Sequence, residues 1–256
     1  MRSDVVVFVG PTIGPIEARA HLNAIYLPPV SQGDVVRAVL KHRPAAIAIV
    51  DGEFAQRPAV RHKEILWAMA VGVQVYGASS MGAIRAAELT DQGMVGHGFV
   101  FRWYLRTVMA DDAEVAVAMA PPEFGSFALG DALLDIRLTL RRAERERIIG
   151  RECRLYLEYE AQLLHFTGRS YDQILSIALL GCRYDTQLKD LKGWIALNKV
   201  RRKRADAIGL LRLLANLSFP SDGVAPRSRP FEVTEAFLFD LEYSGLLQEF
   251  VTYRPH

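Results

Sequence analysis

The sequence predicts an α/β protein with a parallel-sheet N-terminal core and a mainly helical C-terminal part. Residues 5–9 and 46–50 are uninterrupted apolar runs, which are typical of strands covered on both faces. A third run with β character follows at residues 73–76. Helical patterns accompany the strands at residues 15–24, 34–41, 59–71 and 81–89. Strands that alternate with helices pair in parallel through right-handed crossovers, so we expect one parallel sheet.

Turn and capping residues delimit these elements. Gly10 and the proline after it end the first strand, and Asp51 begins the turn that ends the second. Asp34 is suited to the first turn of the helix that follows it. Pro58 lies where the next helix begins, and Gly72 lies where that helix ends. A tight turn over residues 77–80 then connects the third strand to its helix.

The chain divides at a proline-containing break over residues 121–125. We expect an α/β core over residues 1–125 and a helical region over residues 126–256, packed on the core or on a partner. Before the break, an alternating pattern at residues 114–119 predicts a strand. The helices of the second region are expected at about residues 129–165, 171–182, 186–217 and 232–247.

Composition and charge exclude several classes of protein. The chain has 31 basic and 29 acidic residues, a balance that indicates neither nucleic acid nor an anionic membrane as an obligatory partner. Its two cysteines, Cys153 and Cys182, have no zinc-site or disulfide spacing, and the N-terminus lacks a signal-peptide pattern. Residues 65–84 are nearly uncharged, but glycines interrupt them, which argues against a membrane span. We therefore expect a cytoplasmic protein.

Three turns follow the three predicted strands, at residues 10–12, 51–54 and 77–82. Ligands of open α/β sheets bind outside the carboxyl ends of the strands. If the strands are parallel, the three turns share that edge of the sheet. The sequence therefore predicts the functional site there.

The third turn has the pattern of a nucleophile elbow. Residues 78–82 read small-x-Ser-x-Gly between a strand and a helix, which exposes the hydroxyl of Ser80. The N–H of Met81 is then placed to stabilise an oxyanion. A second interpretation is structural: Ser79 or Ser80 caps the helix, and Gly82 is small because the helix packs closely.

A serine nucleophile needs a base, and Lys63 is a candidate. It lies beside His62 in the first turn of a helix, one turn before Trp67. An apolar setting and the helix dipole both favour a neutral amine. The alternatives are an ion pair of Lys63 with Glu64 or Asp51, and a purely structural role for His62.

Other polar segments give weaker indications. Arg85 and Glu88 are spaced to pair on one helix. The acidic residues at 111–114 lack histidines nearby, so we expect a solvated turn and no metal.

Residues 10–14 lack the dinucleotide and P-loop patterns, so no cofactor is expected. The basic run at residues 199–204 is interpreted as a solvated helix face, with an acidic partner as the alternative.

Motifs in the N-terminal half carry a resemblance to the TfuA-like family. They are VFVGPT at residues 7–12, YLPPVSQGDV at 26–35, DGEF at 51–54, PAVRHKEIL at 58–66, GASSMGAIRAAEL at 77–89, GMVGHG at 93–98 and DDAEVAV at 111–117. The segment at 77–89 is the most specific of these. The resemblance covers about residues 5–120, and the helical half carries no matching motif.

The resemblance implies an accessory role beside a YcaO enzyme in the thioamidation of peptide backbones. It implies hydrolysis of a thiocarboxylated ThiS-like sulfur-carrier protein by a Ser–Lys pair, which would release sulfide for YcaO. Carried onto this sequence, the pair is Ser80 or Ser79 with Lys63, and the elbow pattern favours Ser80. The precursor peptide is a further expected partner. ATP activation belongs to YcaO, so no cofactor is assigned to this chain.

Several residues are expected to bind or orient the substrate. They are Asp51, His62, Met81, Arg85 and Thr12. Two rival functions remain open at this point. One is a non-catalytic adaptor that docks YcaO and its peptide, and the other is a nucleotide-binding domain with its site at residues 10–12.

Overall fold

The computed structural model describes residues 4–107, 110–181, 184–219 and 231–253. Within these ranges the chain forms two compact units. The first, called the sheet unit, consists of residues up to 107 together with those from 204 onward. The second, called the helical unit, consists of residues 110–203. The packing boundaries thus lie after residues 109 and 203, because the last helices of the chain supply apolar side chains to the sheet unit.

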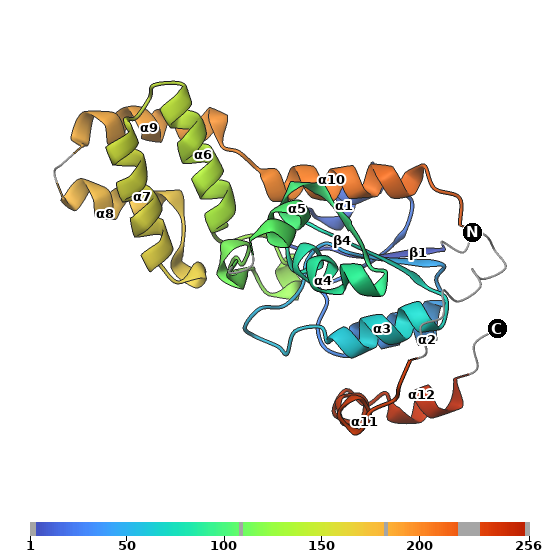
Figure 1. The fold of residues 1–256 in the computed structure, drawn as a ribbon. Coiled ribbons are helices and arrows are strands. Elements are labelled where there is room, and N and C mark those ends of the chain that lie inside the picture. Colours follow the sequence, from blue (N-terminus) through green and yellow to red (C-terminus); the bar gives the residue numbers. More distant parts are fainter. Residues whose placement is uncertain (1–3, 108–109, 182–183, 220–230, 254–256) are drawn as a thin grey trace. The chain divides into compact units, whose positions relative to one another are not determined.

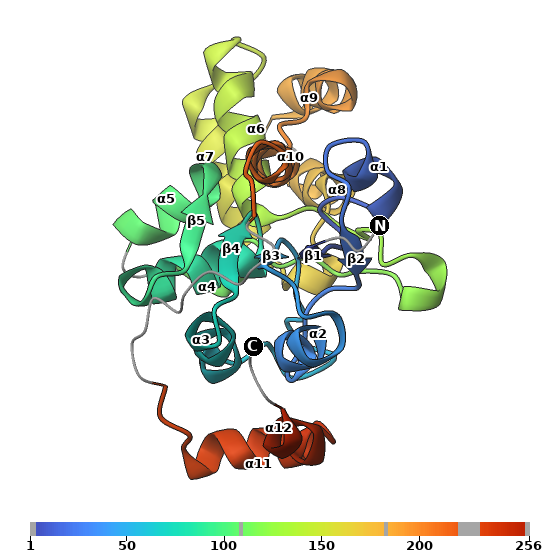
Figure 2. The ribbon, with the colours of Figure 1, turned by 90° about the vertical axis from the view of Figure 1, so that its right-hand side faces the viewer.

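The sheet unit contains five parallel strands in the order β2-β1-β3-β4-β5 (Figure 2). The predicted strands are confirmed as β1 (Val5–Phe8), β3 (Ala46–Ile49) and β4 (Gln74–Ala78). Two edge strands were not predicted, β2 (Ile25–Leu27) and β5 (Val95–His97). Each has only three residues, too few to show a period of two.

Helices cover both faces of this sheet (Figures 1 and 2). On one face α2 (Asp34–His42), α3 (His62–Ala70) and α4 (Met81–Leu89) pack on Val6, Phe8 and Ile47. The C-terminal helix α11 (Glu235–Tyr243) adds Phe237 and Leu241 to the same core, and α12 (Leu247–Thr252) packs Phe250 against it. On the other face lie α1 (Pro15–Arg19) and, from Arg204 onward, α10 (Arg202–Ala215). Beside β4 and β5, α5 (Gly98–Arg106) packs on α4.

The helical unit is built from four α-helices around one apolar core. They are α6 (Leu133–Arg145), α7 (Arg151–Leu163), α8 (Tyr171–Leu180) and α9 (Asp185–Asn198). The predicted helix at 129–165 is interrupted between α6 and α7, where Arg147 has a φ of +62° that a helix cannot continue. The predicted helix at 186–217 is likewise two helices, α9 and α10.

Short 3-10 turns occupy the connections η1 (Thr90–Gln92), η2 (Asp112–Glu114), η3 (Pro122–Phe124) and η4 (Phe166–Gly168). The strand predicted at residues 114–119 was wrong, because η2 begins that segment and only Met119 makes an isolated bridge, to Ala128. No helix in the described ranges is long and apolar enough to cross a membrane.

Two glycines allow α4 to lie directly on the sheet. A Cβ atom at Gly82 would be 1.8 Å from the carbonyl oxygen of Ile49 in β3. A Cβ atom at Gly77 in β4 would be 2.0 Å from the carbonyl oxygen of Gly82 itself. Real Cβ atoms do not approach backbone so closely, so any larger residue must push the helix away from the strands. The predicted close packing at residue 82 is confirmed.

Gly82→Ala should therefore destabilise the sheet unit by about 3 kcal/mol or more, because the new methyl group collides with backbone rather than with a flexible side chain. Gly14→Ala is the matched control in the same unit. Gly14 has a φ of −73°, and a Cβ atom added there would have no other atom within 4 Å. Its substitution should change the free energy of unfolding by less than about 1 kcal/mol. Urea unfolding of both variants measures the difference, and equal midpoints would contradict this packing account.

Candidate functional site

A strained turn connects β4 to α4. Ser79 has a φ of +73°, a region that non-glycine residues occupy at a cost of about 1–3 kcal/mol. The N–H of Ser80 donates to the carbonyl of Ala78 at 3.0 Å, which closes a three-residue γ-turn around Ser79. The predicted strand–turn–helix geometry of an elbow is thus present. Its strained residue is Ser79, one position before the serine that the spacing favours.

The Ser80 hydroxyl is not used to cap the helix. Ser80 occupies the N-cap position of α4, yet its side chain makes no capping hydrogen bond. The residue is 2% exposed. Among the described residues, the adjacent Met81 N–H also has no acceptor, whereas the Ala83 N–H donates to the Ser80 carbonyl at 2.9 Å. The capping interpretation is therefore wrong for Ser80, and a hydroxyl and an N–H donor remain together at the start of the helix.

Asp51 and Thr12, from two predicted turns, meet at the carboxyl edge of the sheet. Asp51 Oδ2 accepts hydrogen bonds from the N–H groups of Gly10 at 2.9 Å and Thr12 at 3.0 Å. Its Oδ1 accepts from the Thr12 hydroxyl at 2.6 Å. The carboxylate is completely buried. Asp51 therefore ties the turn after β1 to the end of β3.

The chain itself covers the point between β1 and β3. In this strand order the topological switch lies there, where doubly wound folds bind their ligands. Val30 bridges to Gly52 and its N–H donates to the Asp51 carbonyl at 3.0 Å. A Cβ atom at Gly10 would be 2.4 Å from the ring of Pro29. This packing argues against the nucleotide site considered for residues 10–12.

Lys63 is directed toward the C-terminal segment. Its ammonium donates to the carbonyl of Glu232 at 3.4 Å and lies 5.5 Å from the centre of the Phe231 ring. Within the described part of the chain these are its polar and ring contacts, and neither Ser79 nor Ser80 is among them. The structure thus places the two members of the predicted Ser–Lys pair in one unit but does not join them.

The ion pairs considered for Lys63 are also not formed in the described ranges. Glu64 is buried, and its carboxylate accepts from the N–H groups of Gly33 at 3.1 Å, Val35 at 3.1 Å and Arg61 at 2.8 Å. Burial raises the pKa of Glu64 to about 7, although the three hydrogen bonds oppose that rise. Glu64 therefore anchors the start of α2 to the start of α3.

His62 and Arg85 share one carboxylate at the outer end of this site. His62 Nε2 lies 2.8 Å from Glu88 Oε2, and Arg85 Nη1 donates to the same oxygen at 2.7 Å. Arg85 Nε also donates to the Val60 carbonyl at 3.1 Å. The predicted Arg85–Glu88 pair is confirmed, and its function here is to link α4 to the segment that precedes α3.

Two residues near the serine turn were missed by sequence reasoning. Glu53 follows Gly52, which lies against the side chain of Met81. The Oε2 atom of Glu53 is buried and has no hydrogen-bond partner in the described ranges. Burial raises the pKa of Glu53, Arg57 opposes this, and Asp34 adds to it. His97 ends β5 and pairs in register with Ala78, the residue before the strained serine. Both residues lie in segments that the sequence analysis singled out, at 51–54 and 93–98, but neither was proposed as a site residue.

The remaining polar segments have structural contacts. Asp111 Oδ1 accepts from the Ala113 N–H at 2.8 Å, and Glu114 pairs with Arg137 at 3.1 Å. Within the basic run, Lys203 is 5% exposed and donates to the Val115 carbonyl. A solvated face was therefore the wrong interpretation for Lys203.

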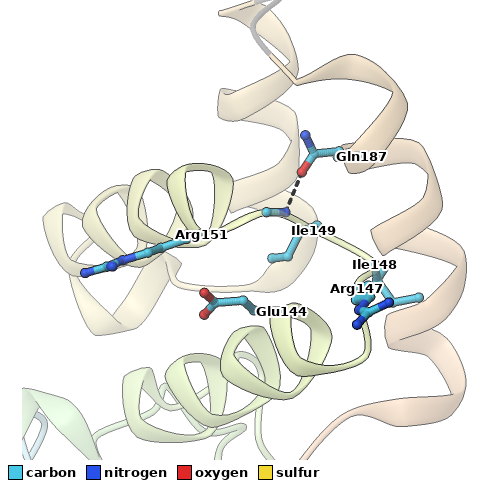
Figure 3. A pocket seen from close by; sticks show the side chains of 7 residues that line it. Glu144, Arg147, Ile148, Ile149, Arg151 and Gln187 are labelled. Atoms are coloured by element: carbon cyan, nitrogen blue, oxygen red, sulfur yellow. Dashed lines mark hydrogen bonds between the residues drawn. The ribbon is translucent and has the colours of Figure 1, made fainter.

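A separate pocket lies in the helical unit, at the connection between α6 and α7 (Figure 3). Its volume is about 410 Å³, and Gln187 closes one side by accepting a hydrogen bond from the Gly150 N–H at 2.7 Å. Glu144, Arg147 and Arg151 provide its charged groups. This pocket contains none of the residues predicted for the site.

Comparison with protein families places this site in context. Residues 51–170 match the family described as TfuA-like protein. The matched segment includes Asp51, Lys63 and the serine turn, and it continues beyond residue 120, where the predicted resemblance ended. No curated protein matches the chain. The predicted resemblance to the TfuA-like family is confirmed from residue 51 onward, and that family is known for accessory proteins of YcaO enzymes.

Proposed function

We propose that this protein hydrolyses the C-terminal thiocarboxylate of a ThiS-like sulfur-carrier protein and delivers the sulfide to a YcaO enzyme. YcaO would use the sulfur for peptide-backbone thioamidation, and this chain would also assist its binding of the precursor peptide. The observation that carries the proposal is the Ser80 hydroxyl, which a strained turn holds at the start of α4 without a capping bond. The match of residues 51–170 to the TfuA-like family supports the YcaO partner.

In the first step the serine oxygen attacks the carbonyl carbon of the thiocarboxylate. The C–S bond breaks, and the serine proton leaves with the sulfur, so a thiocarboxylate anion and a serine give an acyl-serine and HS⁻. The negative charge that develops on the carbonyl oxygen needs a donor. The Met81 N–H and the positive end of the α4 dipole would supply it.

In the second step water cleaves the acyl-serine. One proton of the water returns to the serine oxygen, and the hydroxyl joins the acyl carbon to give a carboxylic acid. This acid loses its proton to solvent, and the carrier leaves with an ordinary carboxylate. The product carrier is therefore unchanged in length. We place this chemistry in the cytoplasm, consistent with a chain whose described cysteine, Cys153, is a buried free thiol.

Lys63 is proposed as the base that receives the serine proton and passes it to sulfur. For this it must be neutral and must leave the Glu232 carbonyl and the Phe231 ring that now hold its ammonium. Asp51 and Thr12 would act by fixing the neighbouring turn, and His62 and Arg85 by orienting the carrier through Glu88. A substrate that displaced the 231–232 segment would free the amine.

Ser80→Ala should reduce sulfide release from a purified thiocarboxylated carrier by at least about 1,000-fold, because the acyl intermediate cannot form. Ser176→Ala, on the exposed surface of α8, is the matched control and should keep full activity. Sulfide is measured directly in the absence of YcaO. Inactivation by Ser79→Ala with an active Ser80→Ala variant would move the nucleophile by one residue.

The adaptor function makes the opposite prediction for the same variants. A non-catalytic partner would support YcaO-dependent thioamidation equally well with Ser80→Ala, given a separate sulfide supply, and would release no sulfide itself. Carrier binding to the wild-type chain without sulfide release above the uncatalysed rate would therefore replace the hydrolase by the adaptor.

Lys63→Arg should lower the hydrolysis rate about 100- to 10,000-fold, because guanidinium is always protonated and cannot accept the serine proton. Lys63→Ala should be equally impaired, and combining it with Ser80→Ala should add little, since paired groups act as a unit. Lys41→Arg, at the exposed end of α2, is the control and should be fully active. An active Lys63→Arg variant would remove this lysine from the mechanism.

A further inference from the structure

The outward side of α11 carries two aromatic side chains that the described part of the chain leaves largely uncovered. Phe239 is 68% exposed and Tyr243 is 70% exposed, and the two lie one helical turn apart. Glu235, one turn before Phe239, and Glu242, next to Tyr243, are exposed on the same side of the helix. We call these four residues the α11 face. Exposed aromatic side chains that adjoin one another are typical of a binding surface.

The opposite side of α11 is packed on the sheet unit. Phe237 and Leu241 are buried in the core that α2 and α3 share with the strands. Between them, Asp240 accepts a hydrogen bond from the Gln32 side chain at 3.0 Å. The α11 face is therefore presented by a helix that is already anchored, and a partner would not have to order it on binding.

The charge of this segment is of one sign. Residues 231–253 contain five acidic residues and no basic residue, in a chain whose net charge is +2. Asp240 is used on the packed side, where Arg61 lies 3.8 Å from it. Glu235 and Glu242 form no ion pair within the described ranges, and no residue three or four positions from either one is basic.

Helix stability explains only one of these two glutamates. Glu235 lies in the first turn of α11, where a negative charge is favourable to the helix dipole. Glu242 lies in the last turn, where a negative charge opposes the dipole and no basic residue compensates for it. The α11 face thus combines uncovered aromatic surface with negative charge that the fold itself does not need.

We propose that the α11 face is a docking surface for a basic amphipathic helix of a partner protein. Phe239 and Tyr243 would supply the apolar contact, and the glutamates would select the partner by charge. Glu235 and Glu242 are seven residues apart, about 10 Å along the helix axis. The partner helix therefore carries lysine or arginine at a similar spacing, with apolar side chains between them. Negative charge disfavours nucleic acid and anionic membranes at this face, and the inference does not depend on the proposed hydrolysis.

A helical peptide of leucine and lysine, about 18 residues long with leucine along one side, provides the probe. The fluorescein-labelled peptide is titrated with the full-length chain, and binding is followed by fluorescence anisotropy. The wild-type chain should bind the probe, and the affinity should fall several-fold as salt is raised, because exposed charge pairs are screened. The same peptide with glutamate in place of lysine should not bind.

Two double variants separate the charge from the apolar contact. Glu235→Lys combined with Glu242→Lys should weaken probe binding at least about 10-fold at low salt and remove most of its salt dependence. Phe239→Ser combined with Tyr243→Ser should weaken binding by about the same factor and retain the salt dependence. Because all four side chains are exposed, both variants should unfold at nearly the wild-type temperature.

Asp190→Lys and Leu197→Ser are the matched controls, since both residues are exposed on α9 of the helical unit, and both variants should bind the probe as the wild type does. Absence of probe binding would overturn the proposal, and so would binding that neither α11 variant weakens. A wild-type dimer that Phe239→Ser dissociates would assign the face to a second copy of the chain instead. Binding to phosphatidylcholine vesicles that Phe239→Ser abolishes would assign it to a lipid surface instead.

Discussion

The direct contact between α4 and the sheet determines where the proposed chemistry can occur. Gly82 lies so close to the Ile49 carbonyl that no side chain fits between them. Gly77 in β4 lies equally close to the backbone of α4, and it too has no room for a side chain. Because α4 begins in direct contact with the sheet, the chain must change direction within Ser79 and Ser80. The reversal gives Ser79 its φ of +73° and leaves the Ser80 hydroxyl at the helix N-terminus. The strain is thus a consequence of helix packing, and the packing energy of α4 maintains it.

At the other strand ends of the sheet unit, the polar side chains hold neighbouring segments together. Asp51 closes the turn after β1, Val30 covers the topological switch point, and Glu64 fixes the start of α2. The common ligand position of this strand order is therefore filled by the chain itself, and the serine turn lies at the end of β4. On the neighbouring strand, the His97 ring packs against Gly209 of α10, which returns to the sheet from the far end of the sequence.

Sequence patterns predicted those features that depend on neighbouring residues. The buried strands β1 and β3 are continuous apolar runs, and the turn around Ser80 has a recognisable spacing. The edge strands β2 and β5 are too short to show a period. The surroundings of His97 include Asp206 and Gly209, more than 100 positions away along the chain, so the local motif at 93–98 could not show these contacts. Lys63 and Glu232 are 169 positions apart, so no local pattern could show their contact when the Ser–Lys pair was predicted.

Identification of the acylated residue tests the central claim most directly. The wild-type protein is mixed with a thiocarboxylated carrier, quenched with acid during turnover, digested and analysed by tandem mass spectrometry. The account predicts the carrier's C-terminal acyl group in ester linkage to Ser80. Rapid sulfide release with no acyl group on either serine of the turn would contradict covalent catalysis at this site.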